Sequence, residues 1–241
     1  MKIALIGYGK MGKAIESYAI QRGHEIVVKI DSSTLLKDTD LSQCDIAIEF
    51  TRPELAVDHI HHCVSNGIPI VVGTTAWKER LTEVEAAVVE QKGSVLYASN
   101  FSIGVNLFFT INKELARIMA PYKEYKASIE EIHHTQKIDA PSGTAVTIAE
   151  GILEENKNYN HWELTHDPSQ VEEQNLAVIA KREDSVPGTH LVKYTSDIDT
   201  ISFEHVAHNR DGFALGAVIA AEWLGNKKGL FTMHDVLKIN L

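Results

Sequence analysis

The sequence is poor in several features that commonly identify a protein's class. Its only cysteines, Cys44 and Cys63, show no zinc or redox spacing and lie in apolar surroundings typical of a core, which indicates a reducing compartment. No apolar run approaches the length that crosses a bilayer. The apolar start of the chain is too short for the core of a signal peptide. We therefore expect a soluble, cytoplasmic protein.

Positive charge is also scarce, since 23 lysines and arginines face 33 acidic residues and leave a formal net charge of −10. The chain lacks the basic footprint that nucleic-acid binding needs, so we expect no nucleic-acid partner. An anionic ligand would have to be held by local donors and a few placed cations, because the overall field opposes it. The 241 residues, 44% of them hydrophobic, are enough for one large domain or two smaller ones.

What the chain does contain is a dinucleotide-binding fingerprint in its required context. A buried-strand pattern at residues 2–6 runs into Gly7-x-Gly9-x-x-Gly12, and a helical pattern follows to about residue 21. A second strand at 25–30 closes on Asp31, which lies 19 positions after Gly12. The pattern predicts that the loop and this acid contact a cofactor; the residues are Gly7, Tyr8, Gly9, Lys10, Met11, Gly12 and Asp31.

Strands and helices continue to alternate up to about residue 100. Strand patterns at 46–50, 68–72 and 95–98 are separated by helical patterns at 53–66 and 76–92. This order predicts a Rossmann-type, doubly wound parallel sheet, in which ligands bind beyond the carboxyl ends of the strands. Further cofactor-facing candidates at those ends are Thr51, Gly73, Thr74, Thr75, Ala98, Ser99, Asn100 and Phe101.

The second half follows a different plan, with several strands in succession. It predicts a smaller α+β domain with a mainly antiparallel sheet. The expected strands are 126–131, 176–181, 190–195 and 200–208, the expected helices are 105–119 and 145–155, and 156–174 is expected to be a loop. A helix at 213–224 and an amphipathic tail at 230–239 are expected to return to the first domain. The predicted domains are 1–104, completed by 212–241, and 105–211.

The segment from Glu131 to Ala145 is the hardest to explain as structure alone. It places His133, His134 and Lys137 within five residues, and imidazole and a desolvated amine can both move protons near neutral pH. Ser142-Gly143-Thr144 resembles a helix start, whose free N–H groups and positive dipole end would hold a carboxylate or phosphate. Proton donors beside an anion cradle predict catalysis on an acidic small molecule.

Two simpler interpretations of the histidine pair have to be weighed. Such a pair is commonly a surface or satisfied core feature. Metal binding is a second possibility, but adjacent side chains in an extended segment point to opposite faces, so His133 and His134 are a poor chelating pair. Neither cysteine lies near them in the sequence. We expect no metal site.

With these elements in place, the chain resembles the dihydrodipicolinate reductase family over essentially its whole length. The resemblance rests on the first glycine loop, Gly73-Thr74-Thr75, the segment Ala98 to Asn106 and above all Glu131 to Ala145. A late match covers His208-Asn209-Arg210 and the following Phe213-Ala214-x-Gly216-Ala217.

The resemblance implies an enzyme that reduces 4-hydroxy-tetrahydrodipicolinate, through dihydrodipicolinate, to tetrahydrodipicolinate with NADPH or NADH, on the diaminopimelate route to lysine. It implies that His133 is the proton donor and acceptor and that Lys137 is the second proton donor. His134, Gly143 and Thr144 become ligands of a small dicarboxylate substrate, and the glycine loop and strand ends become cofactor contacts. The family's second domains associate through their sheets, which implies a homotetramer and no membrane partner.

The chain departs from the family pattern at three places. Its first loop is one residue shorter than in many members and closer to the general dinucleotide pattern. Asp31 is followed by Ser32 and Ser33, where many members have an arginine that suits a 2′-phosphate, so NADH and NADPH both stay open. The segment from Lys181 to His190 matches the family's glycine-rich loop only in part, and no role is assigned to it or to Arg210.

Two other functions share part of this pattern. An aspartate or homoserine dehydrogenase would share the first hundred residues but not the His-His-Lys segment. An NAD(H)-sensing regulator would need no titratable cluster beside an anion site, and would often carry a basic DNA-reading helix.

Overall fold

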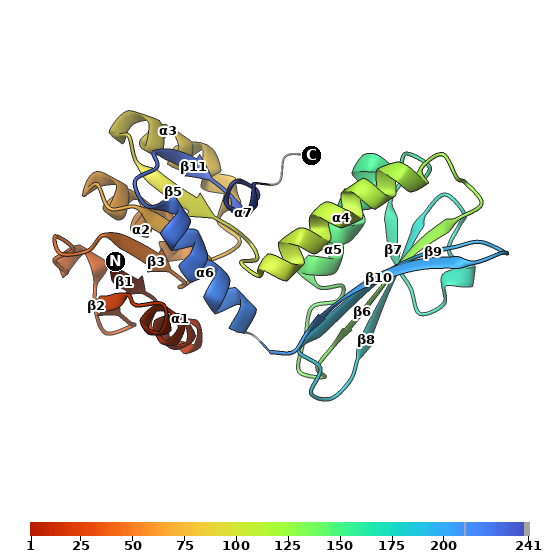
Figure 1. Cartoon of the computed structure of the whole chain (residues 1–241), viewed down its shortest axis with the longest axis horizontal. Coiled ribbons are helices and arrows are strands. Elements are labelled where there is room, and N and C mark those ends of the chain that lie inside the picture. The colour runs from red at the N-terminus through yellow and green to blue at the C-terminus, as the bar shows by residue number, and fades with distance from the viewer. Residues whose placement is uncertain (210, 239–241) are drawn as a thin grey trace. The chain divides into compact units, whose positions relative to one another are not determined.

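The computed structural model describes residues 1–209 and 211–238, which form two compact units (Figure 1). Unit 1 contains residues 1–106 and the described residues from 211 onwards; unit 2 contains residues 107–209. Arg210 of the late motif and Ile239 of the predicted tail lie outside the described residues. Among the helices that are described, none combines the length and apolar character needed to span a membrane.

Unit 1 is built on a parallel six-stranded sheet, as the strand–helix alternation predicts. The strand order is β11-β5-β4-β3-β1-β2, and every neighbouring pair is parallel. The strands are β1 (Lys2–Ile6), β2 (Glu25–Ile30), β3 (Ile46–Glu49), β4 (Ile70–Val72), β5 (Ser94–Tyr97) and β11 (Gly229–Phe231). Because all strands run the same way, their carboxyl ends meet at one edge of the sheet, where ligands of such folds bind.

Helices cover both faces of this sheet and bury two separate cores (Figure 1). One core packs α2 (Pro53–Ser65) and α3 (Leu81–Gln91) on the sheet, and the other packs α1 (Lys10–Gln21), α6 (Asp211–Leu224) and α7 (Met233–Leu237). Short 3₁₀ turns occur at Leu36–Asp38 and Lys78–Arg80. The C-terminal segment thus completes the first unit.

Two helix starts differ from the sequence-based expectation. The first helix begins at Lys10 rather than at residue 13, because Gly9 already has extended backbone angles and serves as the N-cap. The helix expected at 76–92 begins only at Leu81, because Ala76 adopts a left-handed conformation with φ of 61° and the chain then makes a 3₁₀ turn. Both differences lie in segments that follow the carboxyl ends of strands of the sheet.

Unit 2 contains a mixed five-stranded sheet, in which the longer pairings are antiparallel, as predicted, and two shorter pairings are parallel. The order is β10-β9-β6-β8-β7; the β10–β9 and β9–β6 pairs are antiparallel, and the β6–β8 and β8–β7 pairs are parallel. The strands are β6 (Lys126–His133), β7 (Trp162–Leu164), β8 (Leu176–Arg182), β9 (Gly188–Thr195) and β10 (Thr200–Ala207). The helix after β6 acts as a crossover connection, which returns the chain parallel to β6. The expected loop at 156–174 contains β7 and a 3₁₀ turn at Pro168–Gln170.

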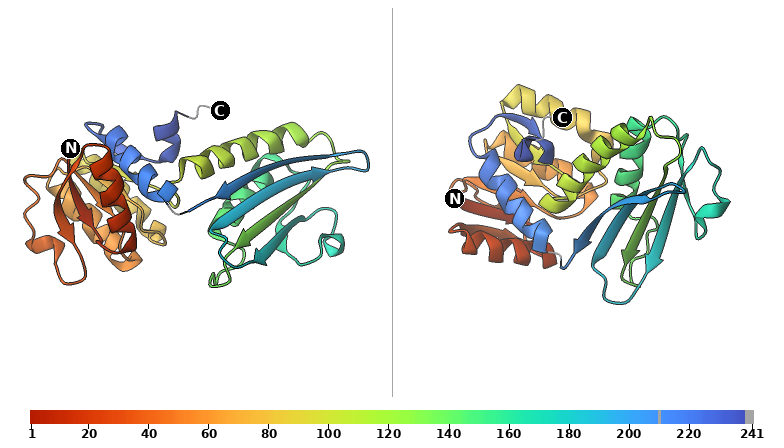
Figure 2. Two further views of the ribbon diagram at one scale, coloured as in Figure 1. Left: turned by 60° about the horizontal axis from the view of Figure 1, so that its bottom comes forward. Right: turned by 45° about the vertical axis from the view of Figure 1, so that its right-hand side comes forward.

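Two helices, α4 (Ile103–Met119) and α5 (Gly143–Glu155), pack on one face of this sheet (Figure 2). Alternate residues of β6 face them, which explains why Ala127 and Ile129 are buried with the apolar residues of both helices. The next two residues on the same face are Glu131 and His133, and both are also buried. The apolar face of the sheet therefore ends in a cluster of ionisable groups.

Candidate active site

The first glycine loop of unit 1 is shaped by positions at which no side chain fits. Gly7 has φ of 99°, and a Cβ there would lie 2.0 Å from the carbonyl oxygen of Phe50. A Cβ at Gly12 would lie 2.5 Å from the carbonyl oxygen of Gly7. Gly9, the N-cap of α1, has nothing within 4 Å of a Cβ and offers no side-chain cap to the first amides of the helix. These amides are suited to a pyrophosphate.

The carboxyl ends of β3 and β4 border a cavity of about 250 Å³ beside this loop. The backbone N–H of Thr51 donates to Oγ1 of Thr74 at 2.7 Å, which ties the two strand ends together. A Cβ at Gly73 would collide with the Phe50 ring at 2.1 Å. The cavity is lined by Met11, Phe50, Thr51, Pro53, Gly73, Thr74 and Thr75. The structure therefore brings together the predicted residues from three separate loops.

The segment after β5 forms its part of this edge of the sheet mainly with its backbone. Phe101 is buried in the core, with its ring 5.8 Å from that of Phe50. A Cβ at Gly216 of α6 would lie 1.8 Å from the Phe101 carbonyl oxygen, so this helix packs directly on the segment. Asn100 accepts a hydrogen bond from the Ser102 N–H at 2.8 Å, while Ser99 is exposed.

The acid after β2 and its neighbours form a polar edge on the same unit. Oδ1 of Asp31 accepts hydrogen bonds from the N–H and the hydroxyl of Ser33, and these bonds hold the pKa of Asp31 below its usual value. Lys29 is paired with Glu16 at 2.6 Å and lies over the Tyr8 ring, whose hydroxyl also donates to Glu16. Lys10 is exposed at the start of α1.

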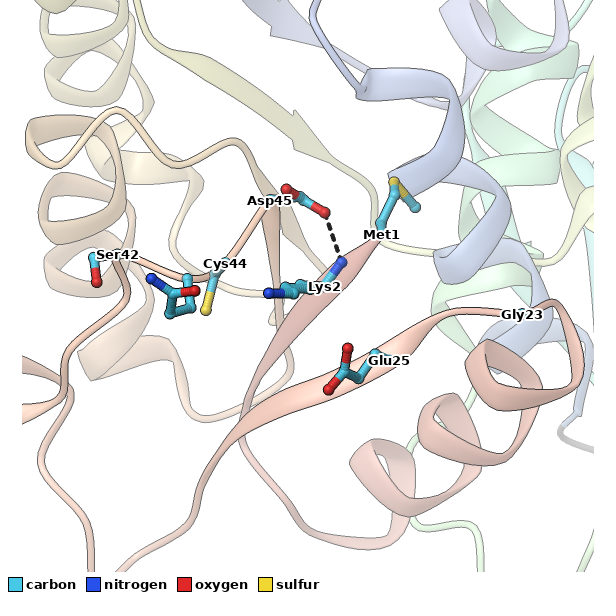
Figure 3. Close-up of a pocket in the computed structure, with 8 residues that line it drawn as sticks. Met1, Lys2, Gly23, Glu25, Ser42, Cys44 and Asp45 are labelled. Carbon is cyan, nitrogen blue, oxygen red and sulfur yellow. Dashed lines mark hydrogen bonds between the residues drawn. The ribbon is translucent and has the colours of Figure 1, made fainter.

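A larger cavity, of about 450 Å³, lies at the amino ends of the strands in unit 1 (Figure 3). It is bordered by Lys2 and Glu25 at the starts of β1 and β2, and the Lys2 N–H donates to Asp45 at 2.7 Å. Ligands of doubly wound sheets bind at the opposite, carboxyl edge. The smaller cavity therefore fits a cofactor site better than the larger one.

In unit 2, His133 is the last residue of β6 and is 8% exposed. Its Nδ1 lies 3.3 Å from Oε2 of Glu131, close enough for an ion pair but without the alignment of a good hydrogen bond. A Cβ at Gly188 would lie 3.0 Å from its Nε2, so the start of β9 needs a glycine to leave this atom uncovered. The His190 ring meets the His133 ring edge to face at 5.1 Å.

Glu131 is the fully buried centre of this cluster. Its two oxygens accept the Ser142 N–H at 3.0 and 3.1 Å, and Arg182 approaches Oε1 at 3.4 Å. Burial alone would raise the pKa of Glu131, but His133 and Ser142 outweigh it and lower the pKa to about 2. His190 lies 3.8 Å away; burial and the neighbouring His133 lower its pKa to about 4, against the attraction of Glu131. Glu131 is thus ionised and His190 neutral at physiological pH.

Lys137 lies in the loop that follows β6. Its Nζ contacts both carboxylate oxygens of Asp139 at 2.8 Å, and this pairing lowers the pKa of Asp139. Arg182 fixes the loop by donating to the carbonyl oxygens of Lys137 at 3.3 Å and Asp139 at 2.6 Å. The same guanidinium therefore contacts Glu131 and the backbone that carries Lys137.

The predicted anion cradle is the start of α5. Ser142 is the N-cap, and its hydroxyl accepts the Ala145 N–H at 3.1 Å. Gly143 is exposed and Thr144 half-buried, and no described residue accepts a hydrogen bond from either N–H group. Two amides at the positive end of a helix dipole can hold one carboxylate. His134, directly after β6, is half-buried.

One group in the described part of the chain has the composition of a metal site, namely Glu131, His133 and His190. Its carboxylate already accepts the Ser142 N–H, and the permanently charged Arg182 lies 3.4 Å from it. A cation beside the carboxylate opposes the binding of a metal ion, and the residues fit an internal ion-pair network better.

Sequence reasoning missed Arg182, Gly188 and His190 as parts of this site. The signal exists only in the strand register: β6 and β9 pair Glu131 with His190, and β6 and β8 pair His133 with Arg182. The segment from Lys181 to His190, to which the sequence assigned no role, thus supplies three neighbours of His133.

Comparison with known proteins places both halves of the sequence in one family. The family description "Dihydrodipicolinate reductase, N-terminus" matches residues 1–101, and "Dihydrodipicolinate reductase, C-terminus" matches residues 104–237. A 4-hydroxy-tetrahydrodipicolinate reductase of Christiangramia forsetii is 46% identical over 237 residues, 98% of each chain. One from Neisseria gonorrhoeae is 36% identical over 212 residues, 84% of this chain and 76% of the relative.

A solved structure shares the fold. A dihydrodipicolinate reductase from a Paenisporosarcina species, solved with bound dipicolinate, superposes with a TM-score of 0.75 at 22% identity, covering 96% of this chain and 97% of that one. The family match spans both halves of the sequence, including the His-His-Lys segment that separates it from other dehydrogenases and from sensor proteins of the same fold. This chain belongs to the dihydrodipicolinate reductase family.

Proposed function

We propose that this protein catalyses the NAD(P)H-dependent reduction of 4-hydroxy-tetrahydrodipicolinate, through dihydrodipicolinate, to tetrahydrodipicolinate in the diaminopimelate route of lysine biosynthesis. The observation that carries the proposal is the cluster in unit 2, where His133 and the Lys137 loop flank the open start of α5. It occurs in a chain that is 46% identical to a named reductase over 98% of its length.

The substrate is a cyclic molecule with two carboxylates. The N–H groups of Gly143 and Thr144, at the positive end of α5, would hold one carboxylate, with His134 as a further ligand. His133 would give a proton from Nε2 to the carbon of the reduced double bond that does not accept the hydride, and Lys137 would act as the second proton donor. For that role Lys137 must exchange its contact with Asp139 for the substrate, which the exposed position of Asp139 permits.

The residues of unit 1 fit a nicotinamide dinucleotide. Gly7, Gly12 and Gly73 allow the close packing that shapes this edge, because a Cβ at each would collide with protein atoms, and the uncapped start of α1 offers amides to a pyrophosphate. When bound, the reduced nicotinamide supplies the hydride for the reduction. The other residues that would contact the dinucleotide are Tyr8, Gly9, Lys10, Met11, Asp31, Thr74, Thr75, Ala98, Ser99, Asn100 and Phe101.

The test is oxidation of NADPH or NADH by the purified protein with freshly generated 4-hydroxy-tetrahydrodipicolinate. We expect turnover with at least one cofactor, together with formation of tetrahydrodipicolinate. Cofactor binding without turnover would contradict the proposal and favour a sensor. Turnover of aspartate semialdehyde or oxaloacetate instead would favour a different dehydrogenase.

We also propose that the protein is a homotetramer assembled through the sheets of unit 2. In the described part of that unit, α4 and α5 lie on the same face of the sheet, and the opposite face carries no helix (Figure 2). That open face displays Ile132, Leu191 and the exposed Val206, which could pack in a subunit contact. Light scattering at micromolar concentration should give four times the 26.7 kDa chain mass; a monomeric mass would refute this assembly.

A further inference from the structure

We propose that Glu131 is a positioning residue for the reaction, acting through His133 and through the start of α5. This inference rests on the proposed function, in which His133 gives up a proton. The family resemblance assigns no role to Glu131, and its side chain is completely buried beneath the residues that would meet the substrate.

The first argument is the geometry at His133. Oε2 of Glu131 lies 3.3 Å from Nδ1 of His133, and both residues project from the same face of β6 because they are two positions apart. A carboxylate at this distance favours the proton on Nδ1 and stabilises the positively charged ring. With the proton on Nδ1, Nε2 is the atom that exchanges a proton with the substrate, and the glycine at position 188 leaves room beside that atom.

The second argument is that the same carboxylate holds the anion cradle. Both of its oxygens accept the Ser142 N–H, and Ser142 is the residue from which α5 begins. One buried group therefore sets the distance between the proton donor and the two amides that would bind the substrate carboxylate. A mechanism that protonates one particular carbon requires such a fixed distance.

The third argument is charge. Five other groups surround this cluster. Arg182 from β8 contacts Glu131, and His190 from β9 meets the His133 ring. His205 from β10 and Lys137 act on His190, and His134 follows His133 in the chain. Two of these carry a positive charge, and His190 is held neutral. Glu131 is the one carboxylate within 4 Å of His133 among the described residues. Without its charge, Arg182 and Lys137 would oppose protonation of His133.

Glu131→Gln tests the inference, because glutamine keeps the size of the side chain and still accepts the Ser142 N–H. We expect kcat to fall by about 10- to 100-fold at neutral pH, with KM changing less than threefold. We also expect the pH above which kcat declines to move down, and Glu131→Asp to restore part of both effects. The matched control is Glu154→Gln, at an exposed carboxylate of α5 that is paired with Lys113, which should leave both unchanged.

An unchanged kcat in Glu131→Gln would overturn the inference, and so would a lower kcat with an unshifted pH profile, which would mark a structural role. A second measurement applies if that variant fails to fold. In ¹⁵N-histidine NMR of the wild-type protein, with His133→Gln for assignment, neutral His133 should carry its proton on Nδ1. A proton on Nε2 would overturn the inference. This spectrum needs no turnover, so its result is independent of the proposed function.

Discussion

The candidate sites of the two units are formed by different kinds of groups. In unit 1 the predicted cofactor edge is made of backbone, and its shape depends on glycines at which an added Cβ would collide with Phe50 or with the loop itself. In unit 2 the site is made of ionisable side chains from three strands, centred on the buried Glu131. A backbone site should tolerate changes in charge and pH but not an added methyl group. A network of ionisable side chains should tolerate an added methyl group better than it tolerates changes in charge and pH.

The difference also concerns how the two sites are held in place. Hydrogen bonds from backbone groups, such as those from the N–H groups of Gly7 and Tyr8 to the Ile30 carbonyl oxygen, fix the glycine loop. In unit 2 the site is held in place by Arg182, which contacts Glu131 and donates to the carbonyl oxygens of the Lys137 loop. Removing one partner of a buried ionic network costs more than the pair contributes, because the other charge stays buried.

The largest expected effect comes from breaking the chemistry of unit 2 while leaving unit 1 intact. His133→Gln should lower kcat by about 10²–10⁴-fold, the usual range for the loss of a general acid. Cofactor affinity should stay unchanged, because the residues that we propose to bind the cofactor belong to unit 1. Steady-state kinetics and fluorescence titration with NADH would measure the two quantities. His161→Gln, at an exposed histidine of the same unit, is the control; an unchanged kcat in folded His133→Gln would rule out the assignment.

The second effect comes from adding one methyl group to the backbone site. Gly7→Ala would force a left-handed residue with a Cβ against the Phe50 carbonyl, so we expect about 2–4 kcal/mol less unfolding free energy and at least tenfold weaker cofactor binding. Urea unfolding and cofactor titration would measure these. Gly23 also has a positive φ, but a Cβ there would meet no other atom within 4 Å. Gly23→Ala should therefore lower the unfolding free energy only by the backbone strain, about 1 kcal/mol. Equal losses in both variants would show that the contact with Phe50 is unimportant.

This contrast explains which parts the sequence predicted. The glycine loop and the parallel sheet of unit 1 follow from local spacing, because each turn is specified by residues within a few positions of it. The short β7 was missed because a strand of three residues leaves little pattern. The parallel β6–β8 pair was missed because pairing between strands some fifty residues apart leaves no local pattern. Arg182 and His190 were missed as site residues for the same reason: only the register brings them beside Glu131.

The third prediction concerns how the unfolding free energy depends on pH, which the buried His190 of unit 2 should control. His190 has a pKa of about 4 in the fold against 6.5 when unfolded, so the unfolded chain binds more protons between these values and stability falls as pH drops through this window. The full loss is about 3 kcal/mol. Glu131, with a pKa of about 2, adds its own loss only below about pH 4.5.

His190→Asn removes this titration, so the dependence of unfolding free energy on pH between 6.5 and 4.5 should flatten, even though the lost ring lowers stability at every pH. Urea unfolding at several pH values would give the slope. The exposed His161→Asn should keep the wild-type slope. If His190→Asn also keeps it, His190 is not the group that titrates.

The smallest expected effect concerns Asp31, the acidic side chain that is predicted to contact the cofactor in unit 1. Its carboxylate, kept ionised by Ser33, can accept the ribose hydroxyls of NADH and should repel the 2′-phosphate of NADPH. The group is exposed, so salt and water weaken this repulsion. Lys29 is already paired with Glu16 and offers little compensation, whereas Lys10 is free to approach a phosphate. We therefore expect both cofactors to work, with kcat/KM differing by less than about 100-fold.

Asp31→Ala should move the ratio of kcat/KM values towards NADPH by about tenfold, because it removes the repulsion and frees the N–H and hydroxyl of Ser33 to donate to the phosphate. Asp40→Ala is the matched control, since Asp40 accepts the Ser42 N–H in the same kind of turn and is also exposed. Added salt should reduce the discrimination of the wild type and leave that of Asp31→Ala nearly constant. A ratio that Asp31→Ala leaves unchanged would show that cofactor choice in unit 1, like its shape, is set by the backbone alone.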